Sequence, residues 1–217
     1  MIRLRDVSKA YSTRSGPVTI FDQVNLDVAQ GERVGILGRN GAGKSTMIRL
    51  VSGAERPTAG SIERDMSVSW PLAFGGAFQG TLTGMDNLRF ICRIYGRNPE
   101  DTIAFVEDFS ELGRYLREPV RTYSAGMRAR LAFAISMVVD FDCFLIDEII
   151  AVGDARFHEK CNYELFERRG DRAMIIVSHD PNFIKAHCQR AVVLSDRKLL
   201  HFATVDEAYD HYTAHPA

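Results

Sequence analysis

The feature that most constrains the fold is a glycine-rich loop between an apolar strand and a helix. Residues 38–46 read GRNGAGKST, which fits the spacing G-x-x-x-x-G-K-[ST] through Gly38, Gly43, Lys44 and Ser45. The apolar run VGIL leads into the loop, and the helical run TMIRLVSG leads out of it. This order of strand, loop and helix predicts an α/β fold in which the loop wraps around phosphate.

The chemistry of this loop points to a nucleotide. Glycines let the backbone curve so that several N–H groups face one phosphate, and the helix that follows adds its positive end. We expect Lys44 to reach the β- and γ-phosphates and the Ser45 hydroxyl to bind Mg²⁺. The alternative, a chance glycine-rich turn, is disfavoured by the strand and helix around it. The expected nucleotide-binding residues of the loop are Gly38, Arg39, Asn40, Gly41, Ala42, Gly43, Lys44, Ser45 and Thr46.

A second chemical feature is a pair of carboxylates at the end of an apolar run. In FDCFLIDEIIAVGD, Asp147 and Glu148 follow what reads as a central strand, and ligands bind at the carboxyl ends of parallel strands. We expect Asp147 to serve Mg²⁺ and Glu148 to orient or deprotonate an attacking water. The alternative is a solvated acidic turn that caps the next helix.

A third apolar run, MIIVSHD, ends with Ser178, His179 and Asp180. A histidine at this edge of the sheet could donate a hydrogen bond to the γ-phosphate. Alone, it is more often a turn or cap residue. Beside the other two motifs, we assign His179 the phosphate role.

Composition limits the remaining classes of protein. The chain has 217 residues, 46% apolar and 25% charged, as in an ordinary globular domain, and its net charge of −1 argues against bulk attraction to nucleic acid. No apolar segment approaches the ~20 residues needed to cross a bilayer. The cysteines form no CxxC pair and are expected to be reduced thiols: Cys92, Cys143, Cys161 and Cys188.

The order of the elements predicts a phosphate-loop NTPase core with a parallel sheet. Residues 1–30 read as strand and turn only, with STRSGP as a loop, which indicates an N-terminal antiparallel β flap. From about Gly84 to Val139 the apolar spacing is helical, so we expect a helical subdomain inserted at 84–139. Residues 1–83 and 140–217 would then form the core and flap of a single domain. Expected strands are 2–7, 24–28, 34–37, 66–69, 143–146, 174–177 and 192–194.

The stretch RTYSAGMRARLAFA contains a second element suited to phosphate. Together with the first loop and the acidic pair, it resembles the nucleotide-binding subunit of an ABC transporter, and the likeness covers nearly the whole chain. YSAGM is similar to that family's signature LSGGQ and keeps the hydroxyl of Ser124 and the bare backbone of Gly126. The alternative is an N-cap followed by an amphipathic helix.

The resemblance implies a head-to-tail dimer around two ATP molecules. The signature of one copy would close over the ATP held by the other copy, which explains two phosphate-binding elements in one chain. Tyr11 matches the family's aromatic residue that stacks on adenine. Asp154, in AVGD, stands where the family crosses the dimer interface; a helix N-cap is the alternative there and does not exclude that role. Gln79 is the nearest candidate for the family's Mg²⁺-sensing glutamine, or else it contacts a membrane partner.

The sequences of three segments indicate which branch of the family the chain resembles. SWPLAFGGAFQGTLTGMDN, TYSAGMRARLAFA and DEIIAVGDARFHEKC resemble the ATPase subunits of bacterial capsular polysaccharide exporters, with O-antigen and teichoic acid exporters as relatives. This implies a peripheral subunit on the cytoplasmic face of the inner membrane, held by a polytopic membrane partner docked near residues 71–96. Some relatives carry a C-terminal carbohydrate-binding domain, and we expect none here.

Two other classes remain as alternatives. A soluble ABC ATPase that acts on nucleic acid or ribosomes usually has two cassettes or long coiled-coil arms, which 217 residues do not fit. A phosphate-loop kinase should have an acceptor pocket and no signature. We therefore expect no nucleic-acid partner, and an ATPase rather than a kinase.

Overall fold

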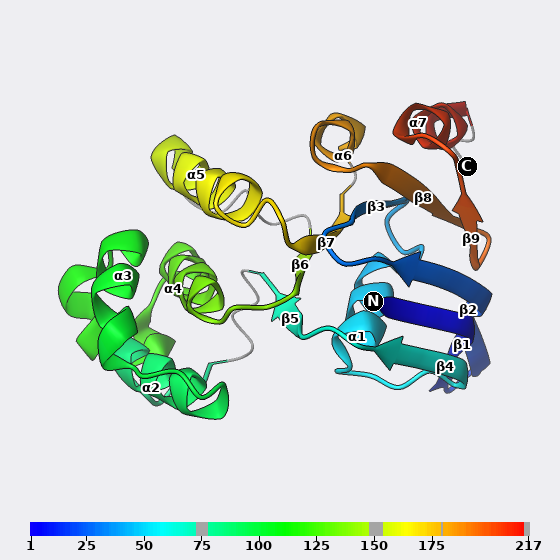
Figure 1. Cartoon of the computed structure of the whole chain (residues 1–217). Helices are drawn as coiled ribbons and strands as arrows, with labels where there is room; N and C mark the ends of the chain where they lie inside the picture. The colour runs from blue at the N-terminus through cyan, green and yellow to red at the C-terminus, as the bar shows by residue number, and fades with distance from the viewer. Residues whose placement is uncertain (73–77, 148–153, 179, 215–217) are drawn as a thin grey trace. The chain divides into compact units, whose positions relative to one another are not determined.

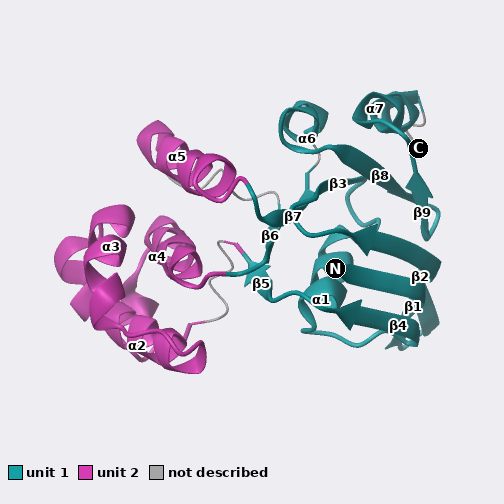
Figure 2. Ribbon diagram, viewed as in Figure 1, with its two compact units in different colours: residues 1–71, 141–148, 171–217 teal, residues 72–140, 149–170 magenta. Residues whose placement is uncertain are grey.

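The computed structural model describes residues 1–72, 78–147, 154–178 and 180–214 and divides the chain into two compact units (Figure 2). The first, here called the core unit, comprises Met1–Pro71, Phe141–Glu148 and Asp171–Ala217. The second, here called the helical unit, comprises Leu72–Asp140 and Ile149–Gly170.

The core unit is built on a sheet that, among the described residues, has six strands in the order β5-β6-β7-β3-β8-β9. All neighbours are parallel except the edge pair β8–β9 (Figure 1). The expected parallel sheet is confirmed. Its strands are β3 (Arg33–Gly38), β5 (Val68–Pro71), β6 (Cys143–Asp147), β7 (Ala173–Val177), β8 (Arg190–Ser195) and β9 (Lys198–His201).

Both faces of the central strands are buried, which explains why they read as continuous apolar runs. In β3, Val34 and Ile36 belong to one core with helix α1 (Lys44–Ser52) and the flap. The opposite face of β3 meets α6 (Pro181–His187): a Cβ on Gly35 would lie 2.4 Å from Ile184 Cγ2. Helix α7 (Val205–Ala214) packs against β8 and β3 (Figure 1).

An antiparallel sheet forms the expected flap. Its described strands are β1 (Ile2–Thr13), β2 (Gly16–Val28) and β4 (Ala59–Arg64), in the order β2-β1-β4. The expectation of a loop over STRSGP is wrong, because Ser12 pairs with Pro17 and Thr13 with Gly16, which leaves a tight hairpin turn. The sequence did not predict strand β4, because Ile62 is the one residue of AGSIER that is even partly buried.

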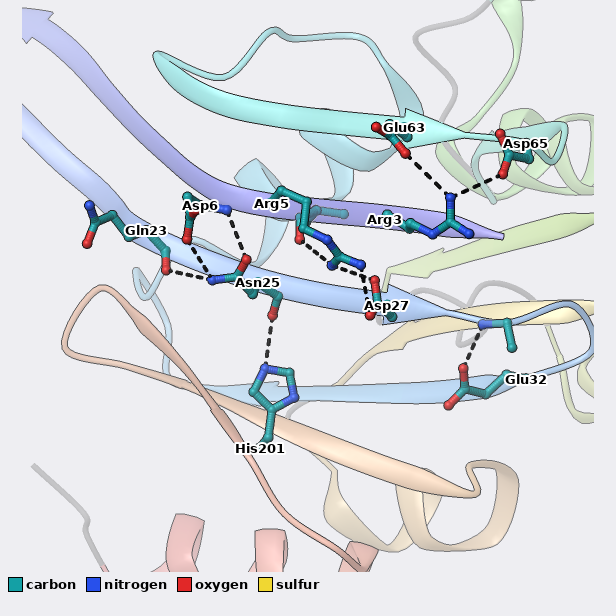
Figure 3. A network of polar contacts seen from close by, with 12 residues as sticks. Arg3, Arg5, Asp6, Gln23, Asn25, Asp27, Glu32, Glu63, Asp65 and His201 are labelled. Atoms are coloured by element: carbon teal, nitrogen blue, oxygen red, sulfur yellow. Dashed lines mark hydrogen bonds and ion pairs between the residues drawn. The ribbon is translucent and has the colours of Figure 1, made fainter.

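Polar contacts join the flap to the edge of the larger sheet (Figure 3). His201 Nε2 of β9 lies 2.9 Å from the Asn25 carbonyl oxygen of β2. The Arg190 guanidinium of β8 donates to the Asp27 carbonyl of β2 and contacts Glu32 at 2.6 Å. Close by, Lys198 reaches the Asp22 carboxylate at 2.6 Å. These contacts hold β2 beside β9, so the flap and the sheet enclose a common core.

The helical unit packs its helices around aromatic rings. Phe109 stacks on Phe133 with centroids 5.5 Å apart, and Phe157 meets both rings edge-on. Its helices are α2 (Gly84–Ile94), α3 (Glu100–Ser110), α4 (Ala125–Val138) and α5 (Ala155–Asn162), with 3-10 turns at Gly113–Arg117 and Val120–Thr122 and a π turn at Tyr163–Glu167. Helix α3 ends at Glu111, which is left-handed at φ +55°.

The division into units differs from the expected boundaries. The sequence placed residues 84–139 in the helical part and 140–217 in the core, whereas residues 149–170 group with the helical unit. Phe157 explains this difference, since it is 3% exposed and packs on rings from α3 and α4. Spacing along α5 marks an amphipathic helix but does not say which partner it covers.

Within the described residues, no helix combines the length and apolar character that crossing a bilayer requires. The four cysteines are free thiols, and burial raises the pKa of Cys143 to about 12.

A close approach in the flap gives a test of this fold. Gly60 has φ +81°, and a Cβ there would lie 2.4 Å from the Asp6 carbonyl oxygen. We expect Gly60→Ala to lower the free energy of unfolding by about 2 kcal/mol or more. Gly53→Ala is the matched control, because Gly53 has the same φ of +81° but its nearest atoms lie 3.9 Å away; it should lose about 1 kcal/mol. Urea denaturation measures both, and equal losses would contradict the close approach.

Candidate functional site

The glycine-rich loop runs from the end of β3 to the start of α1, as the sequence predicted. Gly43 closes it at φ +106°. A Cβ at this position would lie 2.5 Å from Ile20 Cγ2 and 2.9 Å from Phe21 Cε1. Strand β2 of the flap therefore presses on the loop, and only glycine fits between them.

The first turn of α1 is open to an anion. No side chain caps it, and it contains no acidic residue. The leading N–H groups of a helix have no partner within the helix, and together with the helix dipole they favour a negative ligand. Lys44 begins this turn. It is 8% exposed, and its ammonium donates to the carbonyls of Gly38 at 2.6 Å and Arg39 at 3.0 Å.

A cavity of about 280 Å³ lies over this turn. It brings Asp147, at the end of β6, together with the hydroxyl-bearing residues Ser45 and Thr46 of α1. The residues lining it are Ile20, Asn40, Gly41, Gly43, Lys44, Ser45, Thr46 and Asp147. Cationic, backbone and hydroxyl groups on one side and a carboxylate on the other form a site for a phosphate chain with a divalent cation.

Two of the expected catalytic residues, Glu148 and His179, lie outside the described residues. Their described neighbours occupy adjacent strands: Asp147 ends β6, and Ser178 follows β7, which pairs with β6 in parallel. Ser178 Oγ accepts from the backbone N–H of Asp180, and Asp180 caps α6.

The oxygen donors at the cavity fit Mg²⁺. Ser45 offers a hydroxyl and Asp147 a carboxylate, which are the hard ligands that Mg²⁺ takes in small number alongside water and substrate phosphates. In the described part of the chain, no group of three or more His, Cys, Asp or Glu side chains could hold a metal by itself. Two oxygen ligands from the protein suit a cation whose remaining ligands are water and substrate phosphates.

Tyr11 lies in the flap, within the same unit as the cavity. Its phenol donates to Glu55 Oε2 at 2.6 Å, and the Lys9 ammonium sits 4.8 Å from the centre of its ring. The ring is partly exposed, as a base-stacking residue must be. Tyr11 is absent from the residues lining the cavity, so its adenine role stays a prediction.

The signature element begins helix α4 in the helical unit. Ser124 is the N-cap and accepts from the Met127 N–H at 3.2 Å, and both Ser124 and Gly126 remain accessible. Tyr123, which replaces the signature's leucine, is 3% exposed, and its hydroxyl donates to the Tyr115 carbonyl. The tyrosine therefore serves as a buried anchor, and burial raises its pKa.

Asp154 caps helix α5, as one of the two sequence alternatives proposed. Its Oδ1 accepts from the Phe157 N–H at 2.9 Å, and its Oδ2 accepts from Arg130 at 2.9 Å. The Phe157 N–H is the main cause of a lowered pKa for Asp154. Arg130 also bonds Glu111, so this arginine joins α3, α4 and α5. An interface role for Asp154 remains a prediction.

Gln79 is exposed and lies in the helical unit. Its main chain is bound to α2: the N–H donates to Asn87 Oδ1 at 2.9 Å, and the carbonyl accepts from Asn87 Nδ2 at 3.2 Å. Asn87 is 2% exposed. These bonds fix the backbone of Gln79 but do not involve its side chain. Whether that side chain senses Mg²⁺ or contacts a membrane partner stays a prediction.

Sequence reasoning missed the partners of Tyr11. Glu55 accepts from Tyr11, from Arg49 Nε at 2.6 Å and from Lys9 at 3.0 Å. These donors, with the Tyr11 phenol first, lower the pKa of Glu55 from 4.5 to about 2. The sequence carries no signal for this cluster, because the chain must reverse at Gly53 before Glu55 can face α1.

The comparisons with known proteins identify the family of this chain. The family described as ABC transporter matches residues 21–151, so the chain belongs to the ABC transporter family, as one of its ATP-hydrolysing subunits. The chain is 61% identical to the ATP-binding protein BexA of Haemophilus influenzae, over 98% of both chains. It is 58% identical to the capsule polysaccharide export ATP-binding protein CtrD of Neisseria meningitidis serogroup B, over 100% of both.

Solved structures show the same fold at lower identity. The dimeric structure of MJ0796, a bacterial ABC transporter cassette, has a TM-score of 0.74 at 22% identity and covers 92% of this chain and 96% of its own. An ATP-binding subunit of an ABC transporter has a TM-score of 0.78 at 20% identity, covering 98% of this chain and 99% of its own. The fold class and the family expected from the sequence are confirmed.

The low pKa of Glu55 gives a test by pH. Because its folded pKa of about 2 lies below the ordinary 4.5, the contribution of this carboxylate to stability is complete above pH 4.5 and is lost as the pH falls toward 2. Glu55→Gln should therefore unfold more easily than the wild type at about pH 7. The difference should shrink as denaturation is repeated at lower pH, down to about pH 3. A difference that does not change with pH would contradict the ionised, bonded Glu55.

Proposed function

We propose that this chain is the ATP-hydrolysing motor subunit of an exporter that moves capsular polysaccharide, or a related lipid-linked glycan, across the bacterial inner membrane. The observation that carries the motor assignment is the open first turn of α1, which shares one cavity with Asp147. The transported class is supported by the name of CtrD, which is 58% identical over the whole chain.

The described residues support specific roles toward ATP. Lys44 lies under the cavity with two of its three N–H donors on loop carbonyls, which leaves one donor for the β- or γ-phosphate. The N–H groups of the loop and first turn bind the phosphate oxygens. Ser45 and Asp147 would hold Mg²⁺, which supplies charge neutralisation at the phosphates. Glu148 orients and deprotonates the attacking water, and His179 donates to the γ-phosphate.

The signature completes the site of a second copy. The accessible N-terminus of α4, with Ser124 and Gly126, offers a hydroxyl and N–H groups to the γ-phosphate held by a partner. Each phosphate chain then gains donors from both copies only when they meet, so ATP binding favours closure and hydrolysis reopens the pair. Asp154 would border this interface.

A docking surface for a membrane subunit is supported on α2. Phe90 and Ile94, one helical turn apart, are 54% and 57% exposed, and Leu82 before the helix is 39% exposed. Apolar side chains so placed favour a protein partner. The expected docking region, 71–96, includes 73–77, which lie outside the described residues, and Gln79, which either contacts this partner or serves Mg²⁺. Such a partner would place the chain at the cytoplasmic face of the inner membrane.

The catalytic proposal is tested at Glu148. Glu148→Gln keeps the shape of the side chain but removes the base, so ATP turnover should fall by ~10²–10⁴-fold while ATP binding persists. The variant should accumulate as an ATP-bound dimer, which size-exclusion chromatography with ATP detects. Full turnover in this variant would refute the role of Glu148.

The docking proposal is tested at Phe90 and Ile94. The double variant Phe90→Asp/Ile94→Asp should still bind ATP but should no longer be recovered with the membrane fraction. Tyr163→Asp is the control, because Tyr163 is 51% exposed in the same unit but lies in the π turn that follows α5. Equal membrane recovery of the two variants would overturn this surface.

A further inference from the structure

We propose that Glu55 and Arg49 are positioning residues for the nucleotide, which join the base-stacking ring of Tyr11 to the phosphate-binding turn of α1. The inference rests on the proposed binding of ATP at this site. It assigns a task to two charged side chains that touch neither the base nor the phosphates. All the contacts that carry it lie within the core unit.

At the base end, Glu55 fixes the phenol of Tyr11. The hydroxyl of Tyr11 donates to Glu55 Oε2 at 2.6 Å and accepts from Arg49 Nη2 at 3.3 Å. Lys9 also contacts Glu55, at 3.0 Å, while its ammonium lies 4.8 Å from the Tyr11 ring. A ring held at its hydroxyl by two charged groups cannot swing freely about its side-chain bonds, so its stacking face is oriented before a base arrives.

At the phosphate end, the same guanidinium reaches the helix that carries the loop. Arg49 Nη2 donates to Thr46 Oγ1 at 3.1 Å while Arg49 Nε holds Glu55 Oε1 at 2.6 Å. A hydroxyl can accept and donate at once, so the Thr46 hydrogen stays available to a phosphate oxygen. Thr46 is 6% exposed and lines the cavity. Arg49 therefore connects the stacking ring to the phosphate cavity through single hydrogen bonds.

Local structure brings these groups together. Helix α1 ends at Gly53, which is left-handed at φ +81°, and the chain turns back so that the Glu55 N–H donates to the Arg49 carbonyl at 3.1 Å. That bond places the Glu55 carboxylate beside the guanidinium of Arg49. The donors that lower the pKa of Glu55 to about 2 keep it ionised wherever ATP turnover is measured.

Comparing the affinities for ATP and for inorganic tripolyphosphate separates effects at the base-stacking ring from effects at the phosphate cavity. Tripolyphosphate has the phosphates but no base, so the ratio of the two dissociation constants reports the base contact. Glu55→Gln should weaken ATP by about 5-fold and leave tripolyphosphate unchanged. Arg49→Lys should weaken both ligands, because lysine cannot bond Glu55, Tyr11 and Thr46 together.

A double-mutant cycle shows whether Glu55 acts through Tyr11. Tyr11→Phe keeps the ring and removes the hydroxyl, so combining it with Glu55→Gln should weaken ATP no more than either change alone. Asp27→Asn is the control: it breaks the Arg5–Asp27 ion pair of 2.6 Å in the same flap (Figure 3) and should leave both affinities unchanged.

The possible outcomes distinguish failure of the positioning role from failure of base stacking by Tyr11. If Tyr11→Ala leaves the ratio of ATP to tripolyphosphate affinity unchanged, base stacking itself is absent and the inference falls with it. If Tyr11→Ala lowers the ratio but Glu55→Gln, folded by circular dichroism, does not, the stacking stands and the positioning role of Glu55 is overturned. Additive losses in the cycle would likewise overturn it.

Discussion

The site depends on the contact between Gly43 and strand β2. At φ +106°, Gly43 starts α1 where Ile20 and Phe21 leave no room for a side chain. This contact joins the flap to the loop and aims the uncapped end of the helix at the cavity. A helix end with no cap and no acidic residue is costly unless a ligand or water satisfies its N–H groups. The fold thus maintains an anion site, and Arg49 of the same helix connects it to Tyr11 of the flap.

The helical unit carries the signature residues to which we assign the complementary half of the chemistry. Its signature residues lie at the start of α4. The buried Tyr123 donates to the Tyr115 carbonyl, and Ser124 caps the first turn of the helix. Tyr123 replaces leucine with a buried ring whose hydroxyl is satisfied, and the two arginines after the signature bond within the unit: Arg128 to the Tyr123 carbonyl, and Arg130 to Glu111 and Asp154.

The parallel sheet and the position of the glycine-rich loop could be predicted from the sequence. Parallel strands such as β6 and β7 are recognisable as apolar runs, because both of their faces are buried. The spacing of Gly38, Gly43, Lys44 and Ser45 predicts a phosphate-binding loop at 38–46. Strand β4 could not be predicted, because a flap strand with one partly buried residue leaves no apolar pattern. The grouping of α5 with α3 and α4 depends on which rings Phe157 meets, and the Glu55 cluster depends on a chain reversal; neither is encoded by local spacing.

The central claim is that the phosphate loop of one copy works with the signature of another, and mixing two inactive variants tests it most directly. A Lys44→Ala copy keeps its signature, and a Gly126→Asp copy keeps its loop, so only a mixed dimer contains one intact site. An equal mixture should recover about a quarter of wild-type ATP turnover, since half of the dimers are mixed and each has one of two sites intact. No recovery in a mixture whose mixed dimers are detected, or full turnover by the Gly126→Asp copy alone, would contradict the account.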